Sequence, residues 1–169
     1  EEQTFLKDSA KKFALEKTPT THFREVRDSE IENCYDEEIW NEMVTLGWTG
    51  ILIPEEYGGS NFGVAGIASI LEELGKTLTP SPLFSTAVVG VSLVNHASDS
   101  VKKEILSKVA NEGLKLSLAL EETNHHNPKK ISCSVEKKGE DFFRIEEEKV
   151  VLESLKKSKS VIALGGGAF

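Results

Sequence analysis

The sequence is poor in the residues that mark metal-binding and disulfide-rich proteins. It contains two cysteines, Cys34 and Cys133, and four histidines in 169 residues. Two cysteines this far apart form neither a disulfide framework nor the clustered ligands of a zinc site. His125 and His126 are adjacent, so their side chains diverge on an extended backbone, and no further ligand follows at metal-binding spacing. We therefore expect a reducing, cytoplasmic environment and no metal.

Basic charge and long apolar runs are also scarce. The net charge is −8, and residues 1–113 hold 10 Lys and Arg against 19 Asp and Glu. Nucleic-acid binding needs a concentrated basic face, so the sequence excludes this partner. The acidic residues are those expected of a solvated helical surface. No apolar run approaches the roughly 20 residues of a membrane-spanning helix, and we expect no membrane span.

The composition is otherwise that of an ordinary globular protein. With 38% hydrophobic and 28% charged residues, the chain can bury a core. It starts at Glu1 without a methionine, and it stops at Phe169 shortly after a strand-like segment and three glycines. We therefore expect a fragment of a longer protein.

Residues 1–113 show the period of amphipathic helices. A first helix is predicted to end before Pro19, and a polar stretch follows to about Cys34. The acidic residues 36–38 then suit the N-terminus of a second helix, for which Gly47 is the expected C-cap. The predicted buried faces of these two helices are Phe5, Leu6, Ala10, Phe13 and Ala14, and Ile39, Trp40, Met43 and Val44.

Three further helices are predicted before the period changes. One ends at Gly75, and the next begins with Ser81 as N-cap and Pro82 at its first helical position. The last is capped by Asp99 and ends near Gly113. Their predicted buried faces are Val64, Ile67, Ala68, Leu71 and Leu74; Phe84, Ala87, Val88, Val91 and Val94; and Val101, Ile105, Leu106 and Val109.

At Leu114 the hydrophobic period changes from 3.6 to 2. From there every second residue up to position 120 is a leucine, as in a strand with one buried face. Helices followed by strands, without alternation, predict an α+β fold. It consists of an all-α bundle over residues 1–113 and the beginning of an antiparallel β-domain over residues 114–169. The further strand candidates are residues 131–136, 142–146, 149–153 and 160–164.

The most specific motif is the stretch 48–59, which reads Trp-Thr-Gly-Ile-Leu-Ile-Pro-Glu-Glu-Tyr-Gly-Gly. Pro54 and the two glycines predict a turn after an apolar extended segment. Leu-Glu-Glu-Leu-Gly follows at 71–75, Thr-Pro-Ser-Pro at 79–82 and Ala-Leu-Glu-Glu at 119–122. In this order and spacing the motifs resemble those of the acyl-CoA dehydrogenase family, and the likeness covers essentially the whole chain.

The resemblance implies both a fold and a chemistry. Acyl-CoA dehydrogenases have an N-terminal helical domain, a middle β-domain and a C-terminal helical domain. They bind FAD between the last two and oxidise an acyl-CoA thioester to its trans-2-enoyl form. A carboxylate base removes the α-proton while the β-hydride passes to the flavin. The base lies in the C-terminal domain, which this chain lacks, so no catalytic residue is assigned and the chain alone is expected to be inactive.

The same resemblance implies partners. These are an acyl-CoA substrate, an electron acceptor such as an electron transfer flavoprotein, and further subunits in a homo- or hetero-oligomer. Acyl-CoA oxidases share these motifs, and the sequence does not separate them from the dehydrogenases.

Five residues stand at positions where the family contacts the flavin: Leu118, Leu120, Glu121, Val151 and Glu153. Three of them depart from the family pattern. Glu121 replaces a threonine, and its carboxylate would repel the anion of the reduced flavin, whereas a hydroxyl would donate to it. Val151 replaces an aromatic residue, and Glu153 replaces a hydroxyl-bearing one.

These departures leave two interpretations open. The chain is the front part of a flavin-dependent dehydrogenase, or it belongs to a catalytically silent, flavin-free subunit of a heteromeric dehydrogenase. A helical interaction module unrelated to catalysis ranks last, because it explains neither the ordered motifs nor the change of period. Other carboxylates in the motifs, Glu72, Glu73 and Glu122, are expected to be surface or helix-cap residues.

Overall fold

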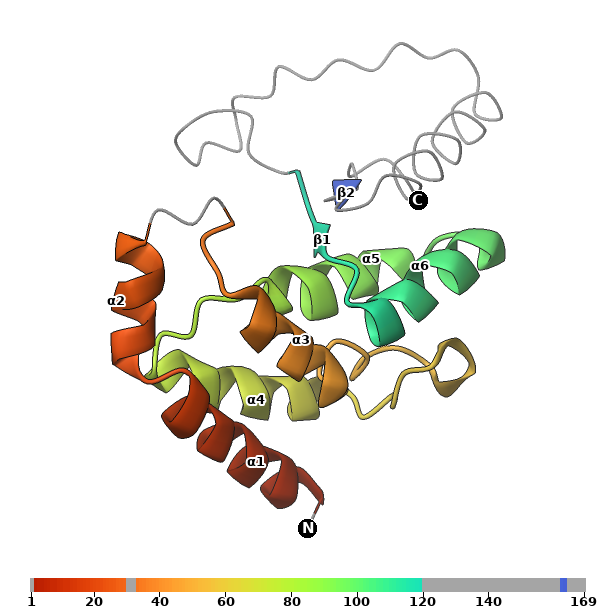
Figure 1. Cartoon of the computed structure of the whole chain (residues 1–169). Helices are drawn as coiled ribbons and strands as arrows, with labels where there is room; N and C mark the ends of the chain where they lie inside the picture. The colour runs from red at the N-terminus through yellow and green to blue at the C-terminus, as the bar shows by residue number, and fades with distance from the viewer. Residues whose placement is uncertain (1, 30–32, 120–161, 164–169) are drawn as a thin grey trace, which may run out of the picture.

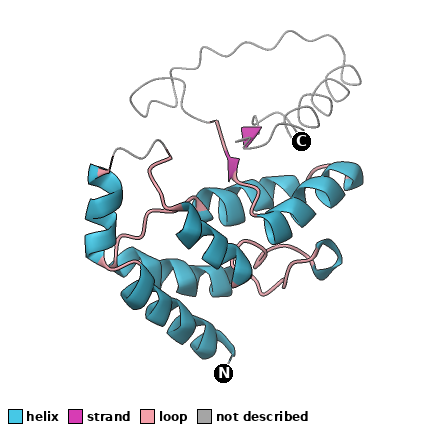
Figure 2. Cartoon of the chain, in the orientation of Figure 1, coloured by secondary structure: helices cyan, strands magenta, loops and turns pink. Residues whose placement is uncertain are grey.

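The computed structural model describes residues 2–29, 33–119 and 162–163. Within them the chain forms helices that lead into a short pair of strands (Figures 1 and 2). The elements in chain order are α1 (Glu2–Lys17), α2 (Thr20–Asp28), α3 (Glu37–Thr45), the 3-10 turn η1 (Glu55–Tyr57), α4 (Val64–Lys76), the π-helix η2 (Phe84–Gly90), α5 (Val91–Val94), α6 (Asp99–Glu112), β1 (Leu116–Ser117) and β2 (Ile162–Ala163). The predicted α+β class is confirmed.

The first predicted helix is confirmed as α1, although Phe5, predicted to be buried, is 78% exposed. The polar stretch after it contains a helix that was not predicted. This helix, α2, begins directly after Pro19, so the proline separates two helices. Val26 is its buried residue and Phe23 is half-buried, while the charged remainder faces solvent. Two apolar residues in nine give too weak a period to be seen in the sequence.

The predicted start of the next helix, α3, is confirmed, and its end lies one residue earlier than predicted, with Leu46 at the C-cap position and Gly47 directly after it. The Asp36 carboxylate accepts hydrogen bonds from the backbone N–H of Glu38 at 2.7 Å and of Ile39 at 3.4 Å, which caps the N-terminus. At the other end Gly47 has a φ of 75°. Its N–H donates to the carbonyl of Val44, and the next N–H in the chain donates to Met43, which is the Schellman arrangement.

The helix α4 differs from the prediction in its face and in its end. Val64 is 70% exposed and Ala68 is also exposed, so the buried stripe is rotated from the predicted one and consists of Gly66, Ile67, Ile70, Glu73 and Leu74. The spacing of the apolar residues did not predict this buried face, because Glu73 occupies one of the buried positions. The helix also continues past Gly75 to Lys76, and the left-handed residue after it is Leu78, with a φ of 57°.

The helix predicted from Ser81 is irregular. Residues 84–90 form the π-helix η2, which continues directly into α5. Ser81 and Pro82 lie before its first turn rather than capping it, and Phe84, predicted to be buried, is 57% exposed. A π-turn has more residues per turn than an α-helix, so a 3.6-residue period misplaces the buried face.

The last predicted helix is confirmed as α6, with one correction at its start. The residue at the N-cap position is Ser98, and Asp99 lies in the first turn. Gly113 ends the helix as predicted, with a φ of 68°.

The described residues pack in two apolar clusters. The first joins α1, α3 and α4 around Trp40, Trp48 and Phe13, and the rings of Phe13 and Trp48 meet edge to face with centroids 4.9 Å apart. The second joins α5 and α6 with Ile53 and Leu116. In Figure 1, α1 and α4 lie together at the bottom of the view, α5 and α6 lie above them, and β1 leaves the helices at the top.

The strand predicted from Leu114 is confirmed, but it is shorter than expected and its pairing differs. β1 pairs with β2 in parallel, with Leu116 opposite Ile162 and Ser117 opposite Ala163. Antiparallel strands were expected here, because helices and strands do not alternate along the chain. These two strands are separated by a long stretch of chain, which permits the crossover that parallel pairing requires. β2 falls inside the predicted strand 160–164, and the other predicted strands lie outside the described residues.

The turn predicted at 54–59 is confirmed, but the apolar segment before it, predicted to be extended, consists of turns over residues 49–52. Gly58 has a φ of 88°, which favours glycine, and the Gly59 N–H donates to the carbonyl of Pro54 at 3.2 Å. The chain then runs back along residues 50–53, because the N–H of Ser60 donates to Gly50 and the N–H of Asn61 donates to Ile53, both at 3.0 Å.

Replacing Gly59 with alanine tests this packing. An added Cβ would overlap the carbonyl oxygen and the side chain of Ile53, so Gly59→Ala should lower the free energy of unfolding by about 1–3 kcal/mol. Gly75→Ala is the matched control, since an added Cβ there meets nothing within 4 Å and alanine favours the helix. Urea denaturation measures both variants, and equal stabilities for the two would contradict the prediction.

Candidate functional site

The structure describes one of the five residues predicted to contact a flavin. Leu118 is half-buried and follows β1 directly. Leu120, Glu121, Val151 and Glu153 lie outside the described residues, so their predicted roles stay predictions. The part of the candidate site whose contacts the structure describes is therefore the place where the chain passes from α6 into β1.

We call this place the junction. Its members come from α3 and the segment just before it, from η2, from the residues that link α6 to β1, and from β1 itself. The residues of the junction are Tyr35, Glu37, Trp40, Thr86, Gly90, Gly113, Lys115 and Leu116.

The helix end at Gly113 is held by Trp40. The indole Nε1–H donates to the carbonyl oxygen of Gly113 at 2.9 Å, in a buried position. Gly113 also lies close against α3, since an added Cβ would be 2.8 Å from Cγ2 of Val44 and 3.0 Å from the indole nitrogen. The positive φ and the close approach both require glycine here.

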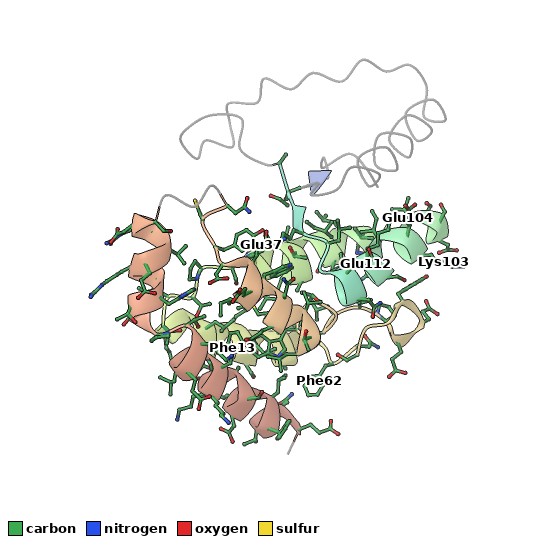
Figure 3. The ribbon with its side chains drawn as sticks, in the orientation of Figure 1. Phe13, Glu37, Phe62, Lys103, Glu104 and Glu112 are labelled. Atoms are coloured by element: carbon green, nitrogen blue, oxygen red, sulfur yellow. The ribbon has the colours of Figure 1, made fainter. Side chains whose placement is uncertain are left out.

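Lys115 ties the start of the strand to α3. Its Nζ lies 2.9 Å from Oε2 of Glu37, and it lies over two aromatic rings, 5.3 Å from the centroid of Tyr35 and 5.7 Å from that of Trp40. The Tyr35 hydroxyl donates to the same Glu37 carboxylate at 2.9 Å. In Figure 3, Glu37 lies at the end of α3 that is nearest to β1.

This arrangement shifts the titration of both groups. Burial alone would lower the pKa of Lys115, but its hydrogen bonds to Glu37 and Tyr35 outweigh that effect and raise the pKa above the ordinary 10.5. Burial raises the pKa of Tyr35 above its ordinary 10.0. Lys115 therefore remains a cation and Tyr35 a neutral phenol throughout the physiological range.

Leu116 is fixed by η2. Its backbone N–H donates to Oγ1 of Thr86 at 3.1 Å, and its carbonyl accepts from the same hydroxyl at 3.4 Å. Gly90 lies one turn further along, where any side chain would overlap the Cβ of Leu116. Thr86 and Leu116 are both fully buried.

The motif carboxylates Glu72 and Glu73 belong to an ion-pair network between α1 and α4. Lys7 lies 3.0 Å from Glu72, and Lys76 lies 2.7 Å from the buried Glu73. The hydrogen bond from Lys7 lowers the pKa of Glu72. This confirms Glu72 as a surface residue and shows that Glu73, expected at the surface or at a helix cap, is buried and paired within the bundle.

Two kinds of site are absent from the part of the chain that the structure describes. None of its His, Cys, Asp and Glu residues gather in threes where they could ligate a metal, and none of its helices combines the length and apolar character needed to cross a membrane.

A family model supports the resemblance found in the sequence. The model described as the N-terminal domain of acyl-CoA dehydrogenase matches residues 1–113. A bundle that ends at Gly113 and passes into a strand through the junction is this N-terminal domain, and the chain belongs to the acyl-CoA dehydrogenase family.

Curated relatives are similar over part of their length. Acyl-CoA dehydrogenase FadE12 of Mycobacterium tuberculosis (strain ATCC 25618 / H37Rv) is 28% identical over 131 residues, covering 76% of this chain and 34% of the relative. Mitochondrial isovaleryl-CoA dehydrogenase of Pongo abelii is 26% identical over 155 residues, covering 85% of this chain and 34% of the relative. The chain thus spans about a third of the length of these relatives.

Solved structures of the family have the same fold. A variant described as the Tcur3481-Tcur3483 steroid ACAD matches with a TM-score of 0.63 and 29% identity, covering 71% of this chain and 32% of that one. The ChsE4-ChsE5 complex from Mycobacterium tuberculosis matches with a TM-score of 0.65 and 22% identity, covering 75% and 35%, and supports the fold alone.

A second family model competes for the rest of the chain. The model described as shikimate kinase matches residues 119–169, which include Leu120, Glu121, Val151 and Glu153. One segment cannot descend from both families. The alignment with isovaleryl-CoA dehydrogenase covers 85% of the chain and so also extends past Gly113 into this segment.

Sequence reasoning missed most of the junction. Trp40 and Gly113 were predicted as a core residue and a helix end, but not as partners, because 73 positions separate them. Thr86 and Lys115 gave no signal, since a single threonine on a helix and a single lysine in a strand are ordinary residues.

Lys115→Met tests the electrostatic part of the junction. The substitution keeps the apolar stem but removes the charge, so it should lower the free energy of unfolding at neutral pH by about 1 kcal/mol, a modest value because the pair is partly exposed. The folded-state pKa of Lys115 is raised, so its contribution is complete below 10.5 and is lost as the pH rises through the folded-state value. The stability difference between wild type and variant should therefore be constant up to about pH 10 and shrink above it.

Urea denaturation across this pH range measures the difference. Tyr35 titrates nearby, so the comparison is repeated in a Tyr35→Phe background, and Lys103→Met serves as a control at an exposed position. A difference that does not change between pH 8 and about pH 12 would rule out the charge as its source.

Proposed function

We propose that this chain supplies the N-terminal helical domain of a flavin-dependent acyl-CoA dehydrogenase, an enzyme that oxidises an acyl-CoA thioester to its trans-2-enoyl form. The observation that carries the proposal is the family match over residues 1–113, which coincides with a bundle closed by Gly113. The FadE12 and isovaleryl-CoA dehydrogenase relatives bear the names of such enzymes.

In this proposal the described residues position the enzyme's strand rather than perform its chemistry. The base lies in a domain outside this chain, and FAD accepts the hydride. Trp40, Lys115 and Thr86 fix the path of β1. We expect this path to lead Leu118 to the edge of the middle domain. The backbone of Leu118 can offer a hydrogen bond to a flavin ring, and its half-buried side chain can pack against one.

The proposed roles of Leu120, Glu121, Val151 and Glu153 depend on residues 119–169 continuing the dehydrogenase fold as the start of its middle β-domain. The shikimate kinase match weighs against this. If the later segment belongs to that other family, the absence of the hydroxyl and aromatic groups of a flavin site at Glu121, Val151 and Glu153 needs no other explanation. The proposed domain boundary near residue 113 is compatible with either assignment of the later segment.

A second candidate is a catalytically silent subunit that completes a partner's site. Two observations favour it: the three departures at flavin positions, and the similarity to a solved structure named by two components, Tcur3481-Tcur3483. That structure's name also suggests a steroid acyl-CoA as the substrate class to test beside straight-chain thioesters. Activity of a lone homo-oligomer would exclude this candidate, and co-purification with a flavin-loaded homologue would support it.

The remaining proposals concern the cellular setting. We place the enzyme in the cytoplasm, assembled as a homo- or hetero-oligomer, with an electron transfer flavoprotein as the acceptor of its electrons.

Two chimeras with FadE12 test the proposal. In the shorter one, residues 1–118 of this chain replace the corresponding N-terminal part of FadE12, and in the longer one residues 1–153 do so. The shorter chimera should retain FAD through gel filtration and lose its flavin absorbance when acyl-CoA is added, as FadE12 itself does if it is the dehydrogenase its name states. A shorter chimera that is folded but colourless, beside a yellow FadE12, would refute the proposed function.

The longer chimera separates the two assignments of the later segment. If Leu120, Glu121, Val151 and Glu153 are flavin contacts, the longer chimera also binds FAD, and Glu121→Thr strengthens binding of the reduced flavin because a donor replaces a negative charge. If the segment belongs to another fold, the longer chimera is colourless and only the shorter one is yellow.

A further inference from the structure

The edge of β1 at Leu116 is occupied by a side chain. In a strand, successive residues direct their backbone N–H and C=O groups to opposite edges. Both groups of Leu116 bond to the hydroxyl of Thr86, at 3.1 Å and 3.4 Å. The groups of Ser117 therefore point to the other edge, where β2 lies in register with β1.

We propose that Thr86 is the edge cap of β1: its hydroxyl takes the place of a neighbouring strand at Leu116, so that a partner strand can join β1 only along the edge of Ser117. The cap also fixes the direction in which Leu118 leaves the helices. This inference concerns the strand itself and holds whether or not the enzyme binds a flavin.

The chemistry of threonine fits this task. A hydroxyl both donates and accepts, so one Oγ1 can satisfy one backbone N–H and one backbone C=O. Thr86 is fully buried, so no water replaces the hydroxyl if it is removed without changing the volume of the side chain. The hydroxyl of a serine could make the same two hydrogen bonds. Valine has nearly the same shape as threonine but could make neither of them.

The surrounding residues direct Leu116 to this hydroxyl. Gly90 leaves room for the Leu116 side chain on the same face of the helix. Lys115, the residue before, forms an ion pair with Glu37 of α3, which limits how far β1 can shift. The strand is thus held from α3 and from η2 at two consecutive residues.

Hydrogen exchange of single amides, followed by NMR on the 169-residue chain, tests the cap. In Thr86→Val the Leu116 amide should exchange at least about tenfold faster than in wild type, because its N–H has lost its acceptor. In Thr86→Ser the rate should stay within about threefold of wild type, because the hydroxyl is retained. Amides in α1 and α4 serve as internal references in each variant.

Thr77→Val is the matched control. Thr77 is also buried, and its hydroxyl donates to the carbonyl of Leu74 at 3.2 Å, at the end of α4. If losing any buried hydroxyl loosened the whole fold, Thr77→Val would raise the exchange rate of the Leu116 amide as much as Thr86→Val does. The edge cap predicts a selective effect of Thr86→Val.

Two results would overturn the proposal. One is a folded Thr86→Val variant whose Leu116 amide is as protected as in wild type. The other applies if Thr86→Val does not fold: a Leu116 amide that exchanges freely in wild type, or more than tenfold faster in a folded Thr86→Ser, excludes Thr86 as its partner.

Discussion

The described structure depends on one requirement, the pairing of backbone polar groups where the chain changes from helix to strand in a buried place. The last carbonyls of a helix and the first amides of a strand have no partners within their own elements. Here the indole N–H of Trp40 donates to the carbonyl of Gly113, and the hydroxyl of Thr86 pairs with both the N–H and the C=O of Leu116. Leaving such groups unpaired away from water is costly, so these side chains determine where the helical domain can end.

The same region joins the two apolar clusters of the bundle. Trp40 belongs to the first cluster and Leu116 to the second, and Leu52 packs against both. Residues 50–62 form a loop whose two arms are joined by backbone hydrogen bonds. This loop places Ile51 in the first cluster and Ile53 in the second. The family motif in this loop thus serves the packing of the domain, and its glycines permit the close approach of two backbone segments.

The sequence predicted those parts of the fold that depend on neighbours in the chain. The acidic start of α3 at residues 36–38 and the helix ends near Gly47 and Gly113 involve residues within one or two turns, and the structure has all three where they were predicted. The helix α2 was missed because Val26 alone is fully buried in it, and the face of α4 was misplaced because a paired glutamate occupies a buried position.

The candidate site was less predictable, for a physical reason. Its contacts join residues far apart in the chain, such as Lys115 with Glu37 and Leu116 with Thr86, and no local period records them. The expected flavin contacts came from resemblance alone. Of these, Leu118 lies just before the segment for which a second family model competes, and the other four lie inside it.

The π-helical turn at 84–90 has a consequence for how this domain varies. A π-turn holds about one residue more than an α-turn, so removing one residue between Thr86 and Gly90 would restore α-helical spacing and leave the segments on either side in phase. Thr86 and Gly90 could then both still face Leu116. A relative with a regular helix one residue shorter here can therefore keep the same bond to the first amide of the sheet, and a single-residue deletion is a smaller change in this helix than in a regular one.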